Sequence, residues 1–174
     1  LVLNTAGPVD ISPVLPYTDD ILLLGQLGTE TGAVLAGILL GQSFPSGKLT
    51  VTWAFPEHPQ RRADTRTHYY KEGIYSGYRY FDSAPEPTLF PFGFGLGYTD
   101  FRLTPGEVLL AGGQVTAYVQ VQNIGAFPGK EVVQMYLSSP WGELDQPPKA
   151  LAAFGKTKLL STGESCRLEL RFRL

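Results

Sequence analysis

Five carboxylates lie where loops meet the expected strands and helices, and carboxylates are the side chains best suited to acid–base chemistry. They are Asp19, Asp20, Glu30, Glu72 and Asp82. Hydrolysis of a glycosidic bond needs two such groups, about 5–5.5 Å apart for retention of configuration or roughly 6.5–9.5 Å apart for inversion. Their spacing along the chain does not by itself bring any two of these carboxylates together. For each one, a catalytic role is therefore weighed against a structural role.

Each carboxylate has an ordinary structural explanation. Asp19 and Asp20 precede a short apolar run and are typical of a solvated turn, while Glu30 suits the positive end of a helix. Glu72 follows Lys71, and Asp82 comes three residues after Arg79. We expect ion pairs from both, and we favour the structural role for all five residues.

Other reactive side chains are few. His58 and His68 stand ten residues apart without an HExxH pattern or a third ligand, and Cys166 is the single cysteine, so we expect no metal site. Ser46 lies in a Pro-Ser-Gly turn and does not match a nucleophile elbow. The glycines of segment 93–97 lack the Lys-Ser/Thr that completes a phosphate loop. We expect no cofactor.

Residues 69–82 hold five tyrosines and one phenylalanine. Their rings could stack on the C–H face of a sugar, or they could pack between domains with each hydroxyl bonded at the rim. We favour packing. Arg61, Arg62 and Arg66 are interpreted as a solvated or inter-domain patch.

The first half of the chain has the order strand, loop, strand, helix. Residues 1–3 and the apolar run 20–24 indicate buried strands of a parallel sheet. In such sheets ligands sit beyond the carboxyl ends of the strands, which points to loops 4–12 and 25–30. Residues 44–53 predict a turn and an alternating strand, and residues 55–100 a long loop.

Helical spacing marks residues 30–40. The apolar positions are Val34, Leu35, Ile38 and Leu39. We expect Thr29 to cap this helix and Gly41 to close it.

From Phe101 the hydrophobic pattern has a period of two, with turn signals between the runs. Five or six short strands predict an antiparallel β-sandwich, which ordinarily has about seven. In the last strand Leu168, Leu170, Phe172 and Leu174 share one face. Because the chain begins and ends inside expected strands, we expect a fragment of a longer protein.

Composition excludes several classes. The 174 residues are 43% hydrophobic and carry a net charge of −2, which argues against disorder and against nucleic acid as the main partner. No apolar run reaches the roughly 18 residues of a membrane span. The compartment stays open, with the cytoplasm slightly favoured over secretion.

Several stretches together resemble the C-terminal portion of glycoside hydrolase family 3, the β-glucosidase and β-xylosidase type. They are residues 1–10, 41–53, 70–81, 91–101, 121–125, 129–136 and 151–154. Gly97 departs from the family, which often has Ser there, and residues 26–30 depart from its Gly-Gln-Glu-Gly-Gly pattern.

The resemblance implies an α/β chain that becomes all-β: a partial α/β sandwich domain with a long connecting loop (1–97) and a truncated fibronectin type III-like β-sandwich lacking its last strands (98–174). It also implies a missing N-terminal (β/α)8 barrel as partner. The family's nucleophile lies on that barrel and its acid/base Glu lies upstream of the strand matching residues 1–4. No catalytic residue is therefore assigned here, and the substrate-binding residues stay unassigned.

The expected function is that of a scaffolding fragment of a retaining exo-glycosidase that removes terminal β-linked sugars from a β-glucoside or related oligosaccharide. The fragment alone is expected to be inactive. The alternative is a non-catalytic sugar-binding or structural module.

Overall fold

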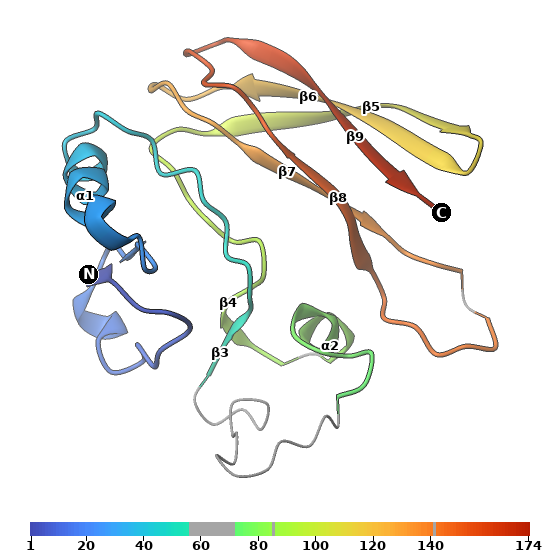
Figure 1. The fold of residues 1–174 in the computed structure, drawn as a ribbon, viewed down its shortest axis with the longest axis horizontal. Helices are drawn as coiled ribbons and strands as arrows, with labels where there is room; N and C mark the ends of the chain where they lie inside the picture. The colour runs from blue at the N-terminus through green and yellow to red at the C-terminus, as the bar shows by residue number, and fades with distance from the viewer. Residues whose placement is uncertain (56–71, 85, 141) are drawn as a thin grey trace.

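The computed structural model describes residues 1–55, 72–84, 86–140 and 142–174 (Figure 1). The first half contains β1 (Val2–Leu3) and β2 (Leu22–Leu23), which pair in parallel with Val2 opposite Leu22. The predicted parallel pairing is confirmed, although β2 is shorter than the apolar run 20–24. Loops 4–12 and 25–30 therefore leave the same edge of this small sheet.

A 3-10 helix, η1 (Leu15–Tyr17), follows β1, and a second, η2 (Gly28–Glu30), leads directly into α1 (Thr31–Leu39). The predicted helix is confirmed, and Gly41, with φ of 70°, closes it by donating its N–H to the Ile38 carbonyl. The prediction of a Thr29 cap is wrong. Glu30 holds the cap position without a side-chain hydrogen bond, because the 3-10 turn itself supplies the preceding backbone bonds.

The core of the first half forms where β3 (Trp53–Ala54) pairs antiparallel with β4 (Thr88–Phe90). Trp53 is buried together with Leu3 and Ile11. The strand predicted over 44–53 is only partly formed. Leu49 instead exchanges backbone hydrogen bonds of 2.8 Å with residues 93 and 94 of the glycine-rich segment.

Part of the tyrosine-rich stretch is helical. The expected long loop contains α2 (Tyr78–Ser83), which begins after Gly77, a residue with φ of 59°. Six residues are too few for a helix to be stable by propensity alone. Its packing against the second half, described below, explains why local sequence did not predict it.

The second half is a sandwich of two sheets (Figure 1). One sheet has the order β5 (Phe101–Ala111), β6 (Gln114–Asn123), β9 (Ser165–Arg173), and the other pairs β7 (Val132–Leu137) with β8 (Ala150–Lys156). Both sheets are antiparallel, as predicted. The fold is thus an α/β unit followed by an antiparallel β-sandwich region.

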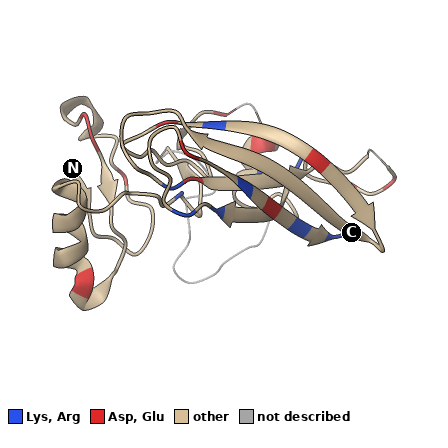
Figure 2. Ribbon diagram, turned by 90° about the horizontal axis from the view of Figure 1, so that it is seen from above, with Lys and Arg blue, Asp and Glu red and all other residues tan. Residues whose placement is uncertain are grey.

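Alternation along β9 divides core from solvent as expected. Val121, Val133, Leu160 and Leu170 form the buried centre. Basic and acidic residues follow one another along β9 (Figure 2), and they occupy its exposed positions. No helix in the described part of the chain has the length and apolar character that crossing a membrane requires.

Candidate functional site

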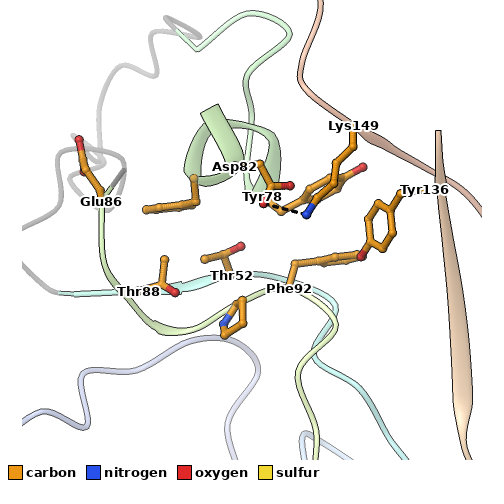
Figure 3. A pocket seen from close by; sticks show the side chains of 10 residues that line it. Thr52, Tyr78, Asp82, Glu86, Thr88, Phe92, Tyr136 and Lys149 are labelled. Atoms are coloured by element: carbon orange, nitrogen blue, oxygen red, sulfur yellow. Dashed lines mark ion pairs between the residues drawn. The ribbon is translucent and has the colours of Figure 1, made fainter. Parts of the chain in front are cut away.

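A hollow lies at the seam between the two halves. It has a volume of about 160 Å³ and is lined from both sides. The first half contributes α2 and the segment around β4, and the second half contributes Tyr136 of β7 and Lys149, just before β8 (Figure 3). The seam is therefore where the candidate side chains are brought together.

One ion pair crosses the hollow. Lys149 Nζ lies 3.3 Å from Asp82 Oδ1, and the two side chains point toward each other (Figure 3). The prediction that Asp82 is ion-paired is confirmed, but its partner is Lys149 and not Arg79, whose guanidinium lies 5.2 Å from the centre of the Tyr78 ring. With 43% and 27% of the two side chains exposed, the Lys149–Asp82 pair contributes about 0–1 kcal/mol to stability.

Tyr78 has several protein partners around its ring and hydroxyl. Its ring stacks on Phe92, with centroids 4.6 Å apart, and its hydroxyl oxygen accepts a 2.8 Å hydrogen bond from the Leu151 N–H. Arg79 approaches the ring as a cation–π partner. The faces of this ring are engaged by protein groups, which supports packing over sugar stacking.

Tyr136 meets the edge of Tyr78, with ring centroids 6.1 Å apart, and Lys149 Nζ lies 5.2 Å from the centre of its ring. Its hydroxyl donates a 2.6 Å hydrogen bond to Gln134 Oε1. Burial, with smaller effects from Tyr78 and Asp82, raises the pKa of Tyr136, so the hydroxyl stays protonated at neutral pH. It acts as a hydrogen-bond donor in the seam.

Tyr75 ties the loop after β7 to the segment before α2. Its hydroxyl donates to Asp145 Oδ1 and lies 3.2 Å from the Gln146 carbonyl oxygen. The hydrogen bond to the carboxylate raises the pKa of Tyr75, and desolvation adds to the shift. Tyr69 and Tyr70 lie outside the described residues.

A second joint is built around Lys48. Its Nζ lies 2.9 Å from Glu131 Oε1 and donates a 2.7 Å hydrogen bond to the Gly95 carbonyl. The Tyr98 hydroxyl donates to the Ile38 carbonyl at 3.0 Å, which joins the start of the sandwich to α1. The glycine-rich segment 93–97 therefore packs across the seam between the two halves of the chain.

The lack of space around segment 93–97 explains two of its glycines. A Cβ atom on Gly95 would collide with the Gly47 carbonyl oxygen, and one on Gly97 would collide with the Phe44 ring. Ser46 is half-buried in a stretch without regular secondary structure, so the predicted turn at residues 45–47 is not formed. Sequence reasoning missed Phe44 and Lys48 because nothing local marks them as joint residues.

The remaining candidates are not brought into the hollow. Asp19, Asp20 and Glu30 are exposed around β2 and α1. Glu72 is half-buried in a turn, and its expected partner Lys71 lies outside the described residues. In the described ranges no cluster of three or more His, Cys, Asp or Glu side chains has the arrangement of a metal site.

Several candidates fall in the segment that is not described. These are His58, His68, Arg61, Arg62 and Arg66. Cys166 is described, half-buried, and burial raises the pKa of its thiol. A thiol with a raised pKa is a poor nucleophile at neutral pH. In the described residues, the first half of the chain is joined to the second half by hydrogen bonds, ion pairs and aromatic packing.

The described fold combines a short parallel strand pair, a seam rich in aromatic side chains and an antiparallel β-sandwich. Residues 1–98 match the glycosyl hydrolase family 3 C-terminal domain, and residues 131–174 match the fibronectin type III-like domain. The chain belongs to glycosyl hydrolase family 3.

Relatives match along nearly the whole chain. A beta-glucosidase A of Butyrivibrio fibrisolvens is 38% identical, over 98% of this chain and 24% of its own length, and a beta-glucosidase of Rhizobium radiobacter is 39% identical, over 91% and 21%. Among solved structures, beta-glucosidase of Kluyveromyces marxianus, in complex with glucose, has a TM-score of 0.90 at 31% identity, covering 99% of this chain and 21% of that one. The chain spans about a quarter or less of these proteins.

Proposed function

We propose that this chain is the scaffolding C-terminal part of a retaining exo-glycosidase that removes terminal β-linked glucose. The observation that carries the proposal is the continuous similarity to the Butyrivibrio beta-glucosidase A, at 38% identity over 98% of the chain. Similarity across both halves and the seam supports a shared architecture as well as a shared domain.

The reaction would use two carboxylates about 5–5.5 Å apart, one as nucleophile and one as acid and base. We infer that both come from polypeptide outside residues 1–174, the nucleophile from an N-terminal (β/α)8 barrel. The contacts at the seam support this, because Asp82 is bound to Lys149 and Glu131 is bound to Lys48, so that both carboxylates have a structural partner. The function of this chain is then positional.

Positioning matters because a displacement of about 1 Å at a reacting group can cost roughly 100-fold in rate. Loops 4–12 and 25–30 leave the carboxyl edge of the β1–β2 pair, the edge at which ligands bind in parallel sheets. We propose that this edge faces the barrel, with the boundary between the two domains of this chain near residue 97.

An aryl β-glucoside assay tests the proposal. The complete enzyme, expressed from the full reading frame, is expected to release the phenol and to give the β-anomer of glucose first. The pure 174-residue chain is expected to show no turnover above buffer. Hydrolysis by the 174-residue chain would place the catalytic acids here, and a complete enzyme that cleaves only an aryl β-xyloside would overturn the glucose assignment.

The 174-residue chain also tests the alternative, which is that it is a non-catalytic sugar-binding module. Titration of the 174-residue chain with glucose and cellobiose, followed by calorimetry, is expected to give no saturable heat. The engaged faces of Tyr78 favour this outcome. Saturable millimolar binding without hydrolysis would favour the module.

A further inference from the structure

The three-stranded sheet has one face that turns away from the core. Residues directly opposite in register share a face, and Thr104, Gln120 and Arg167 form one row across β5, β6 and β9. All three are exposed. Ala117 and Leu170 belong to a row of the opposite face and are buried in the core. Because side chains alternate along a strand, the row of Arg167 lies on the solvent side, which we call the outer face.

Arginine dominates the charge of this outer face. The alternation along β9 places three arginines and Glu169 on it, and the register places Arg102 of β5 on it as well, opposite Gln122. Glu107 lies within the register shift of β5. With four arginines and one glutamate, the outer face has a formal charge of +3 in a chain whose net charge is −2. We call its basic residues the arginine cluster: Arg102, Arg167, Arg171 and Arg173.

Most guanidinium groups of the arginine cluster have no acidic partner. In the described part of the chain, Arg171 is the one member with an ion pair, which it forms with Glu169. Arg167 lies over the Tyr118 ring, with Cζ 3.7 Å from the ring centre. Stacking of this kind leaves the N–H groups at the edge of the guanidinium plane able to donate. Three of the four groups can therefore bind an anion from outside the chain.

The arginine cluster extends along the sheet. Residues two positions apart on a strand lie about 6.8 Å from each other, so Arg167 and Arg173 are separated by about 20 Å. Arg102 lies on the far strand, about 10 Å across the sheet from β9. β6 between them has no charged residue and presents hydroxyl and amide groups, from Thr116 and Gln120 (Figure 2). Widely spaced positive groups with uncharged hydrogen-bonding groups between them suit an extended anionic chain.

The side chains around the arginine cluster favour one kind of anionic chain. Single-stranded nucleic acid binds through aromatic rings that stack on its bases, and the aromatic ring of the outer face, Tyr118, already has Arg167 over it. Binding at a membrane surface needs several large apolar side chains, and Leu109 is the one such residue of the outer face. A polysaccharide with carboxylate groups matches the face, because guanidinium groups pair bidentately with carboxylates and amides bond to sugar hydroxyls.

We propose that the arginine cluster binds an acidic polysaccharide, one with carboxylate groups along its chain, and so holds the complete protein on such material. This binding is separate from hydrolysis, because the outer face shares no residue with the seam or with loops 4–12 and 25–30. The inference therefore does not depend on the proposed function. Each exposed charge contributes little, so the affinity comes from several weak contacts and falls as salt screens them.

Binding of the complete protein to polygalacturonate, which has a carboxylate on every sugar, tests this proposal. Calorimetry is expected to show saturable binding that weakens at least about 10-fold between about 0.02 M and 0.3 M salt, and no binding of uncharged hydroxyethyl cellulose. Arg102→Gln with Arg173→Gln should weaken the binding by about 5-fold or more, because two bidentate contacts are lost. Lys130→Gln with Lys156→Gln, at exposed positions elsewhere on the sandwich, changes the net charge equally. It should weaken the binding by less than about 2-fold.

Equal losses from the arginine pair and the lysine pair would show a general charge effect and overturn the proposal. Absence of binding at low salt, or equal binding of hydroxyethyl cellulose, would also overturn it, and both measurements use wild-type protein. Tighter binding of a single-stranded oligonucleotide or of anionic lipid vesicles, equally sensitive to the arginine pair, would assign the cluster to that partner and overturn the polysaccharide. Thermal midpoints within about 1 °C of wild type are expected for both variants, because all four positions are exposed.

Discussion

The ring of Phe44 fills the space that a side chain at position 97 would need. A Cβ atom built on Gly97 overlaps the Cζ atom of Phe44, and the same ring lies close to Gly129 of the sandwich. Phe44 also makes edge contacts with Tyr98 and Phe101, at centroid distances of 6.1 and 6.3 Å. One aromatic side chain of the first half is thus enclosed by the second.

Gly97→Ser should therefore destabilise the chain although Ser is common at this position in the family. We expect a loss of about 1–3 kcal/mol in the free energy of unfolding, because the ring must leave its position. In a double-mutant cycle, Gly97→Ser should cost little once Phe44→Ala is present. Gly142→Ser, where a Cβ meets open space, is the control for adding a serine. Additive costs of Phe44→Ala and Gly97→Ser would contradict the steric explanation.

Asn123 is the fully buried polar residue at the start of the sandwich core. Its amide donates to the Phe127 and Leu160 carbonyls, at 2.7 and 3.0 Å, and its oxygen accepts from Thr99 Oγ1 at 2.8 Å. Asn123→Ala leaves these groups without partners and should lower the free energy of unfolding by about 2–4 kcal/mol in urea. Gln122→Ala, which removes an exposed 3.3 Å contact, should change it by less than about 0.5 kcal/mol. Equal losses would show that the network is not stabilising.

Lys48 and Glu131 form a more protected ion pair than the others described, with 19% and 18% of their side chains exposed. Removing one partner should cost about 1–3 kcal/mol, because the remaining charge is poorly hydrated. Lys48→Met and Glu131→Gln can be compared by urea unfolding at neutral pH. Lys158→Met breaks the exposed pair with Glu164 and should have no measurable effect. Identical behaviour of the two lysine variants would refute a joint role for Lys48.

Alkaline pH should weaken the Tyr75 contact. The neighbouring Asp145 carboxylate raises the pKa of Tyr75 in the folded chain. The folded state then holds the phenolic proton more tightly than the unfolded state, in which the pKa is about 10. Its contribution to stability is complete below about pH 10 and is lost as pH rises through the folded pKa.

Urea midpoints between neutral pH and the alkaline limit of folding measure this effect. Tyr75→Phe is expected to flatten the alkaline decline, while Tyr17→Phe, at a residue 88% exposed, is expected to leave it unchanged. A decline that is as steep in Tyr75→Phe as in wild type would rule out this tyrosine as its source.

Some of this fold could be predicted because periodicity records burial. The alternation along β9 placed Leu168, Leu170 and Phe172 on one face, and register with β6 confirms this. The helical spacing of apolar residues in α1 and the end of this helix at Gly41 could also be predicted from the sequence. These signals are local, because they depend only on the types of residues that lie a few positions apart in the sequence.

The seam was much less predictable. Asp82 was expected to pair with Arg79, three residues away, and instead binds Lys149 from the other half. The helix α2 was expected to be loop, since six residues signal little by themselves, and its Tyr78 is fixed by Phe92 and Leu151. Such contacts depend on which distant segments meet.

The sequence by itself determined the kind of each half, its turns and the apolar face of its strands, because hydrogen-bond geometry gives helices and strands fixed repeats. Only the tertiary structure decided which tyrosine, lysine and carboxylate meet at the seam. Those choices arise from long-range packing, where a side chain's partner is set by the shape of the assembled layers and has no fixed spacing along the chain.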